Sequence, residues 1–187
     1  MAGGWNKIAK RIRVPMGFAF AALYLWLARP AVGFMALSLL LVVPGLLLRG
    51  YASGYVKKNR ELTMTGPYAY TRNPLYLGSI LIAFGFALAA RSVWIAVALA
   101  ILFAVIYIPT IRGEEEFLRS AFSDFGAYCE RVPRIFPRFT PAVSGQSAPG
   151  EFSSALYRKH REYNALMGAV AIYAALALRL YFKKNGF

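Results

Sequence analysis

The sequence is poor in the residues that form disulfides and bind metals. Its 187 residues include a single cysteine, Cys129, and a single histidine, His160. One cysteine excludes an internal disulfide, and one cysteine with one histidine is too small a donor set for a Cys/His metal site. We therefore predict neither a disulfide framework nor a metal centre.

Acidic residues are also scarce, with eight Asp and Glu against 22 Lys and Arg and a net charge of +14. Such an excess is common in nucleic-acid-binding proteins, where the cations line one polar face. Here the basic residues flank apolar runs, a position that attraction to anionic lipid headgroups explains. We therefore predict a lipid bilayer as partner and no nucleic acid.

Long apolar runs dominate what is present. Hydrophobic residues make up 58% of the chain, above the ~45–50% of soluble domains. A helix needs about 20 apolar residues to cross a bilayer, and shorter runs gain length when flanking arginines snorkel. Since lipid leaves helices as the way to satisfy the backbone, we predict an all-α integral membrane protein, one domain over residues 1–187. About five transmembrane helices are expected, at residues 13–29, 30–49, 74–90, 92–111 and 160–182.

Local signals refine these helices. The first run follows a basic stretch without a processing site, so we expect it to remain as an uncleaved helix. Pro44 and Gly45 are expected to kink the second helix. Residues 153–162 contain no helix breaker, which allows the last helix to begin before the membrane.

The distribution of Lys and Arg predicts orientation. With a cytoplasmic N-terminus, most of them lie in cytoplasmic segments, as the positive-inside rule requires. The opposite side then holds Arg29, Arg91, Arg179, Lys183 and Lys184, and the two terminal lysines run against the rule. All eight acidic residues fall on the cytoplasmic side. We expect the chemistry there, in a plasma or inner membrane.

The first polar segment of interest covers residues 60–78. Gly66-Pro67 is a turn signal, and Pro74 suits the first turn of a helix. The free amides of that helix start, with Arg72 beside them, predict an electropositive pocket. Its further candidate residues are tyrosines that can stack on a ring and a glycine that permits close approach: Tyr68, Tyr70, Tyr76 and Gly78. The alternative is an interfacial aromatic belt with an arginine anchor.

The second segment covers residues 112–139. Three consecutive glutamates, residues 114–116, stand between Arg112 and Arg119, as expected for a cationic ligand or for a solvated face. Residues 128–137 alternate arginines with prolines and aromatics, which suits a lid over a cofactor or a loop on the membrane. Because helices 74–90 and 92–111 cross and return, both segments should meet on one side.

These segments carry a family resemblance. Residues 66–78, Gly-Pro-Tyr-Ala-Tyr-Thr-Arg-Asn-Pro-Leu-Tyr-Leu-Gly, resemble the Gly-Pro-Tyr…Arg-His-Pro-x-Tyr-x-Gly signature of the isoprenylcysteine carboxyl methyltransferase and phospholipid methyltransferase superfamily. The second block of that family is similar to Glu114-Glu115…Leu118…Phe122…Tyr128…Arg131-Val132-Pro133…Pro137. The resemblance spans about 75 residues. Asn73 replaces the usual histidine of the family, so no imidazole role carries over. Spacing near Ser123 and Phe125 is one residue short.

The resemblance implies a methyltransferase that uses S-adenosylmethionine and releases S-adenosylhomocysteine. It implies that cofactor-binding residues include Tyr70, Arg72, Asn73, Pro74, Tyr76 and Gly78. Glu114 and Glu115 are expected to bind the ammonium or the ribose hydroxyls of the cofactor, and Arg131 and Arg134 its carboxylate. Arg112, to hold the acceptor, and Glu115 are the expected catalytic residues.

The acceptor is expected to be hydrophobic and to enter sideways from the bilayer. An isoprenylcysteine-type carboxylate needs only orientation, whereas a phospholipid amine needs a base, for which residues 114–116 are available. The lack of a nearby histidine favours the carboxylate or another membrane amphiphile over the amine. Two alternatives of other classes are a nicotinamide-dependent membrane reductase and a non-catalytic membrane scaffold. The small size argues against the first, and the absence of charge within the central helices argues against a transport path.

Overall fold

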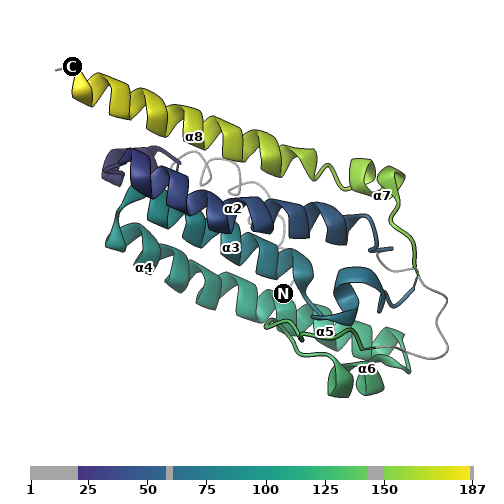
Figure 1. Ribbon diagram of the computed structural model, residues 1–187. Helices are drawn as coiled ribbons and strands as arrows, with labels where there is room; N and C mark the ends of the chain where they lie inside the picture. The colour runs from purple at the N-terminus through teal and green to yellow at the C-terminus, as the bar shows by residue number, and fades with distance from the viewer. Residues whose placement is uncertain (1–20, 58–60, 143–149, 186–187) are drawn as a thin grey trace, which may run out of the picture.

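A computed structural model of the chain describes residues 21–57, 61–142 and 150–185. Within these ranges the molecule contains helices and no strands, which confirms the all-α prediction. The described part of the first predicted helix, 13–29, is helical over residues 21–27, and the rest of that prediction lies outside the described residues. The longer helices run side by side along one direction, as Figure 1 shows.

Two helices form the centre of the bundle. Helix α2 covers Val32–Ser53 and continues through Pro44, and helix α3 covers Pro74–Ala90. Their backbones approach closely because glycines face each other: a Cβ on Gly45 would lie 2.8 Å from the carbonyl oxygen of Gly78, and one on Gly78 would lie 2.6 Å from Cγ of Arg49. Small residues allow such contacts between apolar helices.

The next helix is longer than the sequence predicted. Instead of ending at residue 111, it continues as α4 (Val93–Leu102), a π-helical turn η2 (Phe103–Tyr107) and α5 (Ile108–Ala121). The π turn stands just before Pro109, whose ring nitrogen cannot donate the regular helical hydrogen bond. Beyond it, Ile111, Leu118 and their neighbours keep helical spacing, so the helix projects past the apolar region. Segment 112–139 is therefore helical in its first part.

The end of the chain forms two helices rather than one. Helix α7 covers Ser154–Lys159 and helix α8 covers Tyr163–Lys184, with a break at which Arg161 adopts φ 53°. Tertiary contacts hold the break, because Nδ1 of His160 lies 3.0 Å from the carbonyl oxygen of Ser53 and Glu162 pairs with Arg49. The absence of a local breaker does not prevent a helix from ending where it docks.

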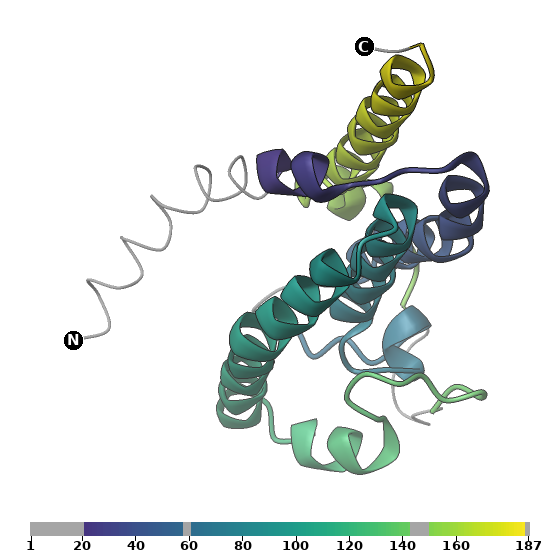
Figure 2. The ribbon, with the colours of Figure 1, turned by 90° about the vertical axis from the view of Figure 1, so that its left-hand side faces the viewer.

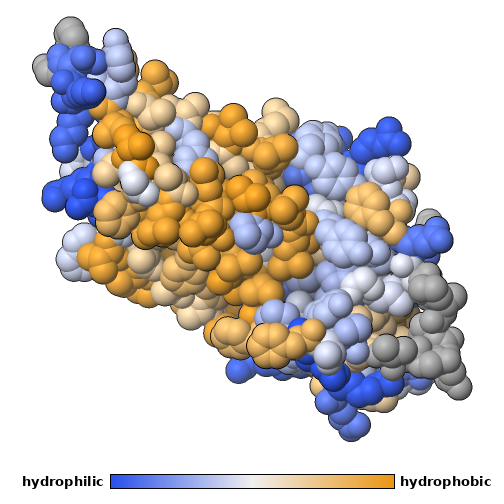
Figure 3. All heavy atoms as spheres, viewed as in Figure 1, coloured by the Kyte–Doolittle hydropathy of each residue, from blue (hydrophilic) through white to orange (hydrophobic). Residues whose placement is uncertain are grey.

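Three helices of the described residues are long and apolar enough to cross a membrane, namely Val32–Ser53, Val93–Ala121 and Tyr163–Lys184. Helix α3 is apolar but shorter. Their outward faces carry large exposed hydrophobic side chains, for example Leu40, Leu47, Val105 and Met167. Figure 3 shows the result, a hydrophobic belt over the bundle with hydrophilic surfaces at both ends. This belt is the surface expected of a protein that lies in a bilayer.

Two separate cores stabilise the molecule. The larger one joins the bundle helices and includes Val42, Phe86, Leu99 and Leu176. The smaller one lies beneath the short helix α6 (Phe125–Arg131) and consists of Phe125, Tyr128 and Val132. Figure 2 shows α6 and the loop after it folded under the end of the bundle, next to the short helix η1 (Gly66–Ala69). The smaller core therefore supports the polar segments.

Candidate functional site

A tight turn leads into the first motif block. Gly66 adopts φ +58°, and a Cβ there would lie 2.5 Å from the ring of Tyr55, so both the backbone and the packing require glycine. Pro67 and Tyr68 in η1 are buried. Asn73 is the N-cap residue of α3 and Pro74 is its first residue. The motif thus connects a buried turn directly to a helix start.

The second block returns alongside the first. The amide of Arg72 donates to the carbonyl of Pro133 at 2.9 Å, and that of Arg138 donates to the carbonyl of Tyr70 at 3.0 Å. Side chains add to this pairing: the Asn73 amide donates to the Arg134 carbonyl at 3.0 Å, and the Thr71 hydroxyl donates to the Ile135 carbonyl at 3.0 Å. The predicted convergence of the two segments is therefore built from backbone hydrogen bonds.

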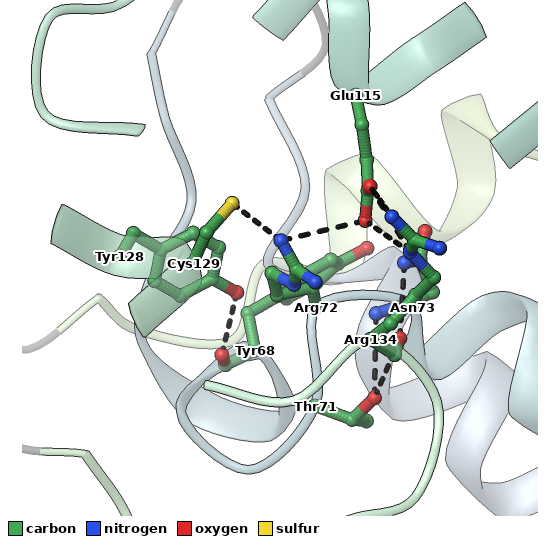
Figure 4. Close-up of polar contacts among 8 residues, drawn as sticks. All are labelled: Tyr68, Thr71, Arg72, Asn73, Glu115, Tyr128, Cys129 and Arg134. Carbon is green, nitrogen blue, oxygen red and sulfur yellow. Dashed lines mark hydrogen bonds and ion pairs between the residues drawn. The ribbon is translucent and has the colours of Figure 1, made fainter. Parts of the chain in front are cut away.

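A carboxylate between two arginines lies at the centre of this pairing, as Figure 4 shows. Glu115 of α5 accepts hydrogen bonds from Nη2 of Arg134 at 2.7 Å and from Nε at 3.1 Å. Nη1 of Arg72 lies 3.5 Å from the same carboxylate and also donates to Sγ of Cys129. The hydrogen bonds that Arg134 donates to Glu115 raise the pKa of Arg134. Arg72 and Glu115 are each about 12% exposed, so this ion pair is largely desolvated.

Tyr68 and Tyr128 form the buried side of the site. The hydroxyl of Tyr128 donates to the carbonyl oxygen of Tyr68 at 2.7 Å, as drawn in Figure 4. Burial raises the pKa of both phenols above their usual value, so both remain neutral at physiological pH. This bond ties α6 to η1.

A polar cavity of about 450 Å³ lies between these elements and the bundle. Its wall includes the candidate Tyr68 and six of the residues predicted to bind the cofactor, Arg72, Asn73, Pro74, Tyr76, Glu114 and Glu115. Glu114 forms no ion pair with another residue that the structure describes. Nε of Arg72 is buried and has no hydrogen-bond partner among the described residues. The cavity therefore offers a carboxylate, a guanidinium N–H, an amide and a phenol, a donor set suited to a ligand with an ammonium group, hydroxyls and a ring.

The inner wall of the cavity is an ion pair between distant segments. Nε and Nη2 of Arg49 donate to the two carboxylate oxygens of Glu162 at 3.0 and 2.9 Å. Arg49 also donates to Ser79 of α3 through Nη1. The pair thus connects α2, α3 and the start of α8 at the cavity wall.

A second cavity of about 500 Å³ adjoins the first. Most of its wall is apolar, from α3, α4 and η2, and Arg112 and Arg134 are the cationic residues that line it. Tyr76 and Tyr107 line both cavities, with their rings edge to face at 5.4 Å. The two spaces are therefore neighbours separated by a pair of tyrosines.

Four predicted cofactor residues do not line the polar cavity: Arg134 lines the second cavity, and three others line neither cavity. Gly78 packs against Gly45 and Arg49 of α2, so its lack of a side chain serves helix packing rather than approach to a ligand. Tyr70 is exposed, and it takes part in pairing the blocks through its carbonyl. Arg131 is exposed, and its Nε donates to the carbonyl oxygen of Ala127 on its own helix. A sequence motif does not distinguish residues that face a site from residues that support it.

Sequence reasoning missed Arg49, Tyr107 and Glu162. Arg49 is the first charge after a long apolar run, and Glu162 is the last charge before another, positions that are typical of membrane boundaries. Tyr107 belongs to the π-helical turn, whose extra residue per turn changes which side chains face α3. A signal for Tyr107 was the proline two residues later, whereas the pairing of Arg49 with Glu162 is a tertiary contact without a local signal.

The fold and the site define a helical membrane protein with a polar cavity and an apolar cavity at one end of its bundle. Residues 48–124 match the model of the phospholipid methyltransferase family, which confirms the predicted resemblance. The match includes the first motif block and the glutamates of α5.

Two curated relatives match over 90 residues each. They are the cobalt-zinc-cadmium resistance protein CzcN of Cupriavidus metallidurans, 40% identical, and the nickel-cobalt-cadmium resistance protein NccN of Alcaligenes xylosoxydans xylosoxydans, 38% identical. Each alignment covers 48% of this chain and 41% of the relative, so less than half of each known protein is represented. No solved structure matches the chain. The described residues contain no group of three or more His, Cys, Asp or Glu that could hold a metal ion.

Proposed function

We propose that this protein transfers a methyl group from S-adenosylmethionine to a hydrophobic, lipid-like acceptor at the cytoplasmic face of a plasma or inner membrane. The observation that carries the proposal is the pair of adjoining cavities: a polar one lined by motif residues and an apolar one, with Tyr76 and Tyr107 in the wall of both. A transfer between a polar donor and a lipid acceptor needs two such spaces in contact.

The polar cavity is the proposed cofactor site. When bound, S-adenosylmethionine supplies an electrophilic methyl group on a sulfonium. The Glu114 carboxylate, which forms no ion pair with a described residue, is suited to the cofactor ammonium. The Nε of Arg72, which has no hydrogen-bond partner among the described residues, is suited to an oxygen acceptor. Asn73 and Tyr76 offer an amide and a phenol for the nucleoside. Because Glu115 already pairs with both Arg72 and Arg134, we assign it as a positioning residue rather than a direct ligand.

The apolar cavity is the proposed acceptor site. Its wall of Ile80, Phe84, Phe103 and other apolar residues suits a hydrocarbon chain, and Arg112 at its polar end suits an anionic head. The chain then contributes mainly orientation and the exclusion of water, since holding two reactants in line removes much of the entropic barrier. These features support an isoprenylcysteine-type carboxylate or a similar amphiphile.

An amine acceptor is the second candidate, and the matched family model favours it, because its description is phospholipid methyltransferase. A phospholipid ammonium must lose a proton before attack. Glu114, which no described cation neutralises, is the proposed base in that case. The cytoplasmic orientation of the N-terminus follows the same proposal, since the cavities lie at the end of the bundle that holds all the acidic residues.

Calorimetric titration with S-adenosylhomocysteine tests the cofactor site in purified protein, both in detergent and in lipid nanodiscs. We expect wild type to bind, and Arg72→Ala and Glu114→Gln to bind at least tenfold more weakly, since each loses a charge-assisted contact. Glu116→Gln is the matched control, because Glu116 neighbours the site residues without lining the cavity. Absence of binding in folded wild type, or binding of a reduced nicotinamide cofactor instead, would refute the proposal.

Transfer of a labelled methyl group then identifies the acceptor. The assay compares a prenylated cysteine carboxylate with phosphatidylethanolamine, at equal concentration in the same nanodiscs. We expect Arg112→Gln to lower transfer to the carboxylate by tenfold or more while S-adenosylhomocysteine binding stays unchanged. If the protein instead methylates the phospholipid, and Glu114→Gln abolishes that transfer, the acceptor is the phospholipid amine.

A further inference from the structure

A second basic site lies at the opposite end of the bundle from the two cavities. A hollow of about 310 Å³ there is lined by Ala28, Arg29, Pro30, Arg179 and Lys183. Three of these five residues are cations. Ala28 and Pro30 are buried and form its floor, whereas the three basic side chains are exposed at its rim. This end belongs to none of the motif blocks.

The floor of the hollow is held in place by hydrogen bonds from two directions. The amide of Arg29 donates to the carbonyl oxygen of Ala90, at the end of α3, at 2.7 Å. Arg179 of α8 donates to the carbonyl oxygens of Leu25 and Trp26, the latter at 3.1 Å, near the end of the helical segment 21–27. The site is therefore a defined junction of three helices and not a mobile tail.

No acidic side chain balances these cations. All eight Asp and Glu residues are described, and they lie at positions 61, 114–116, 124, 130, 151 and 162, at the end of the bundle that holds the two cavities. The four ion pairs of the described residues do not involve Arg29, Arg179 or Lys183. Figure 3 shows this end as a hydrophilic surface directly beside the hydrophobic belt. Three cations around one hollow, without a carboxylate partner among the described residues, favour an anionic ligand.

Aromatic side chains place the hollow at the level of lipid headgroups. Trp26 and Trp94 are 73% and 72% exposed, and Tyr181 on the last turns of α8 is 64% exposed. Exposed Trp and Tyr side chains mark the boundary between hydrocarbon and water. Exposed Leu178 and Phe182 neighbour the basic residues on α8 and suit acyl chains. At the level of the lipid headgroups, the anionic group available to the hollow is the phosphodiester of a lipid.

We infer that this hollow binds the phosphate of an anionic phospholipid in the leaflet opposite the two cavities. The guanidinium groups offer paired N–H donors that match phosphate oxygens, and Lys183 adds a point charge. The bound lipid holds the segment 21–27, the end of α3 and the end of α8 together. It also explains why basic residues are found on a side that the positive-inside rule leaves poor in them.

The test uses the full chain in a mild detergent and measures its thermal unfolding with added short-chain phosphatidylglycerol, phosphatidylcholine or inorganic phosphate. We expect phosphatidylglycerol to raise Tm by a few degrees and to bind as a one-to-one adduct in native mass spectrometry. Phosphatidylcholine and inorganic phosphate at the same concentration should leave Tm unchanged. Equal stabilisation by phosphatidylcholine would overturn the requirement for an anionic lipid, and equal stabilisation by inorganic phosphate would overturn the assignment to a lipid.

Variants separate the hollow from general attraction. Arg29→Gln and Lys183→Gln should each weaken phosphatidylglycerol binding about fivefold, the effect of one cation near a lipid surface. Lys184→Gln is the matched control, because Lys184 is the next residue and does not line the hollow. Binding of S-adenosylhomocysteine should be unchanged in all three. An equal loss in Lys184→Gln, or no loss in the other two, would overturn the site.

Discussion

At the scale of single residues, Glu115 is the side chain on which the polar contacts of the site converge. It accepts hydrogen bonds from Arg134 and forms a desolvated ion pair with Arg72, which joins the first motif block, α5 and the loop after α6. Removing one partner of a buried pair leaves the other charge without compensation, and this lowers stability more than replacing both partners does. The role of Glu115 is therefore to hold two arginines.

Substituting Glu115 tests that role. Glu115→Gln should lower the affinity for S-adenosylhomocysteine at least tenfold, because hydrogen bonds to charged groups are worth about 1.5–3 kcal/mol each. Calorimetry on the purified variant measures the loss, and Glu116→Gln provides the comparison. Because the proposed role is positional, Glu115→Asp should recover part of the affinity. Unchanged binding in Glu115→Gln would remove the residue from the site.

The buried phenol of Tyr128 predicts a dependence on pH. Its pKa is raised by burial, so the folded state keeps the proton that the unfolded chain releases near pH 10. The contribution of the protonated Tyr128 to the free energy of unfolding is complete below pH 10. It is lost as the pH rises from there through the folded-state pKa. Denaturant unfolding between pH 8 and 11 should show a steeper loss of stability for wild type than for Tyr128→Phe. Tyr128→Phe should itself cost about 1–2 kcal/mol at neutral pH, from the lost bond to Tyr68. Parallel curves would contradict the assignment.

At the scale of elements, the contact between α2 and α3 determines where the first motif block lies. Gly45 and Gly78 permit their backbones to meet, and the helix start at Pro74 is fixed by that contact. Arg49, one turn beyond Gly45, then reaches both Ser79 and Glu162. The polar cavity is thus placed by apolar helix packing a few residues away.

Glycine substitutions test this packing. Gly45→Ala brings a methyl group within 2.8 Å of a backbone oxygen of α3, and overpacking of this kind costs about 1–3 kcal/mol. Gly33→Ala is the matched control in the same helix, since nothing lies within 4 Å of its Cβ position. It should be neutral or slightly stabilising. Thermal unfolding in detergent measures both, and equal behaviour of the two variants would argue against the close crossing.

The pair of Arg49 and Glu162 tests whether the last helix contributes to the site. Glu162→Gln and Arg49→Gln should each lower stability and S-adenosylhomocysteine affinity, and the double variant should lose less than the sum of both. A coupling of about 1–3 kcal/mol is expected for residues in direct contact. Thermal unfolding and calorimetry on the four proteins of the cycle measure it. Strict additivity would show that the two side chains do not interact.

At the scale of the whole molecule, charge is divided between the two ends of a hydrophobic belt. One end holds all the Asp and Glu side chains and both cavities, and the other holds basic side chains with no Asp or Glu beside them. We predict the first end in the cytoplasm. In a Cys129→Ser background, Ser120→Cys should react with a membrane-impermeant maleimide only from the cytoplasmic side, and Lys184→Cys only from the other. The reverse pattern would invert the orientation while leaving the cavities unchanged.

Local patterns in the sequence were enough to predict the all-helical class and the two motif segments. Apolar runs in lipid leave few alternatives to helices, and the spacing of glycine, proline, arginine and tyrosine in residues 66–78 is a local pattern that a single chain displays. The family match over residues 48–124 confirms the predicted family resemblance. Both inferences depend on neighbours in the chain, and such information is present in one sequence.

Which residues of those segments face a cavity depends on contacts between helices, which neither segment reveals. Gly78 supports α2, Tyr70 and Arg131 face outward, and Glu115 holds two arginines, whereas Arg49, Tyr107 and Glu162 enter the cavity wall from outside the motifs. The positions of the helix ends also depend on the tertiary structure. Helix α5 continues past its apolar region, and α8 begins where Glu162 contacts Arg49. The physical reason is that burial and ion pairing depend on which helices meet, and residues far apart in the chain make those contacts.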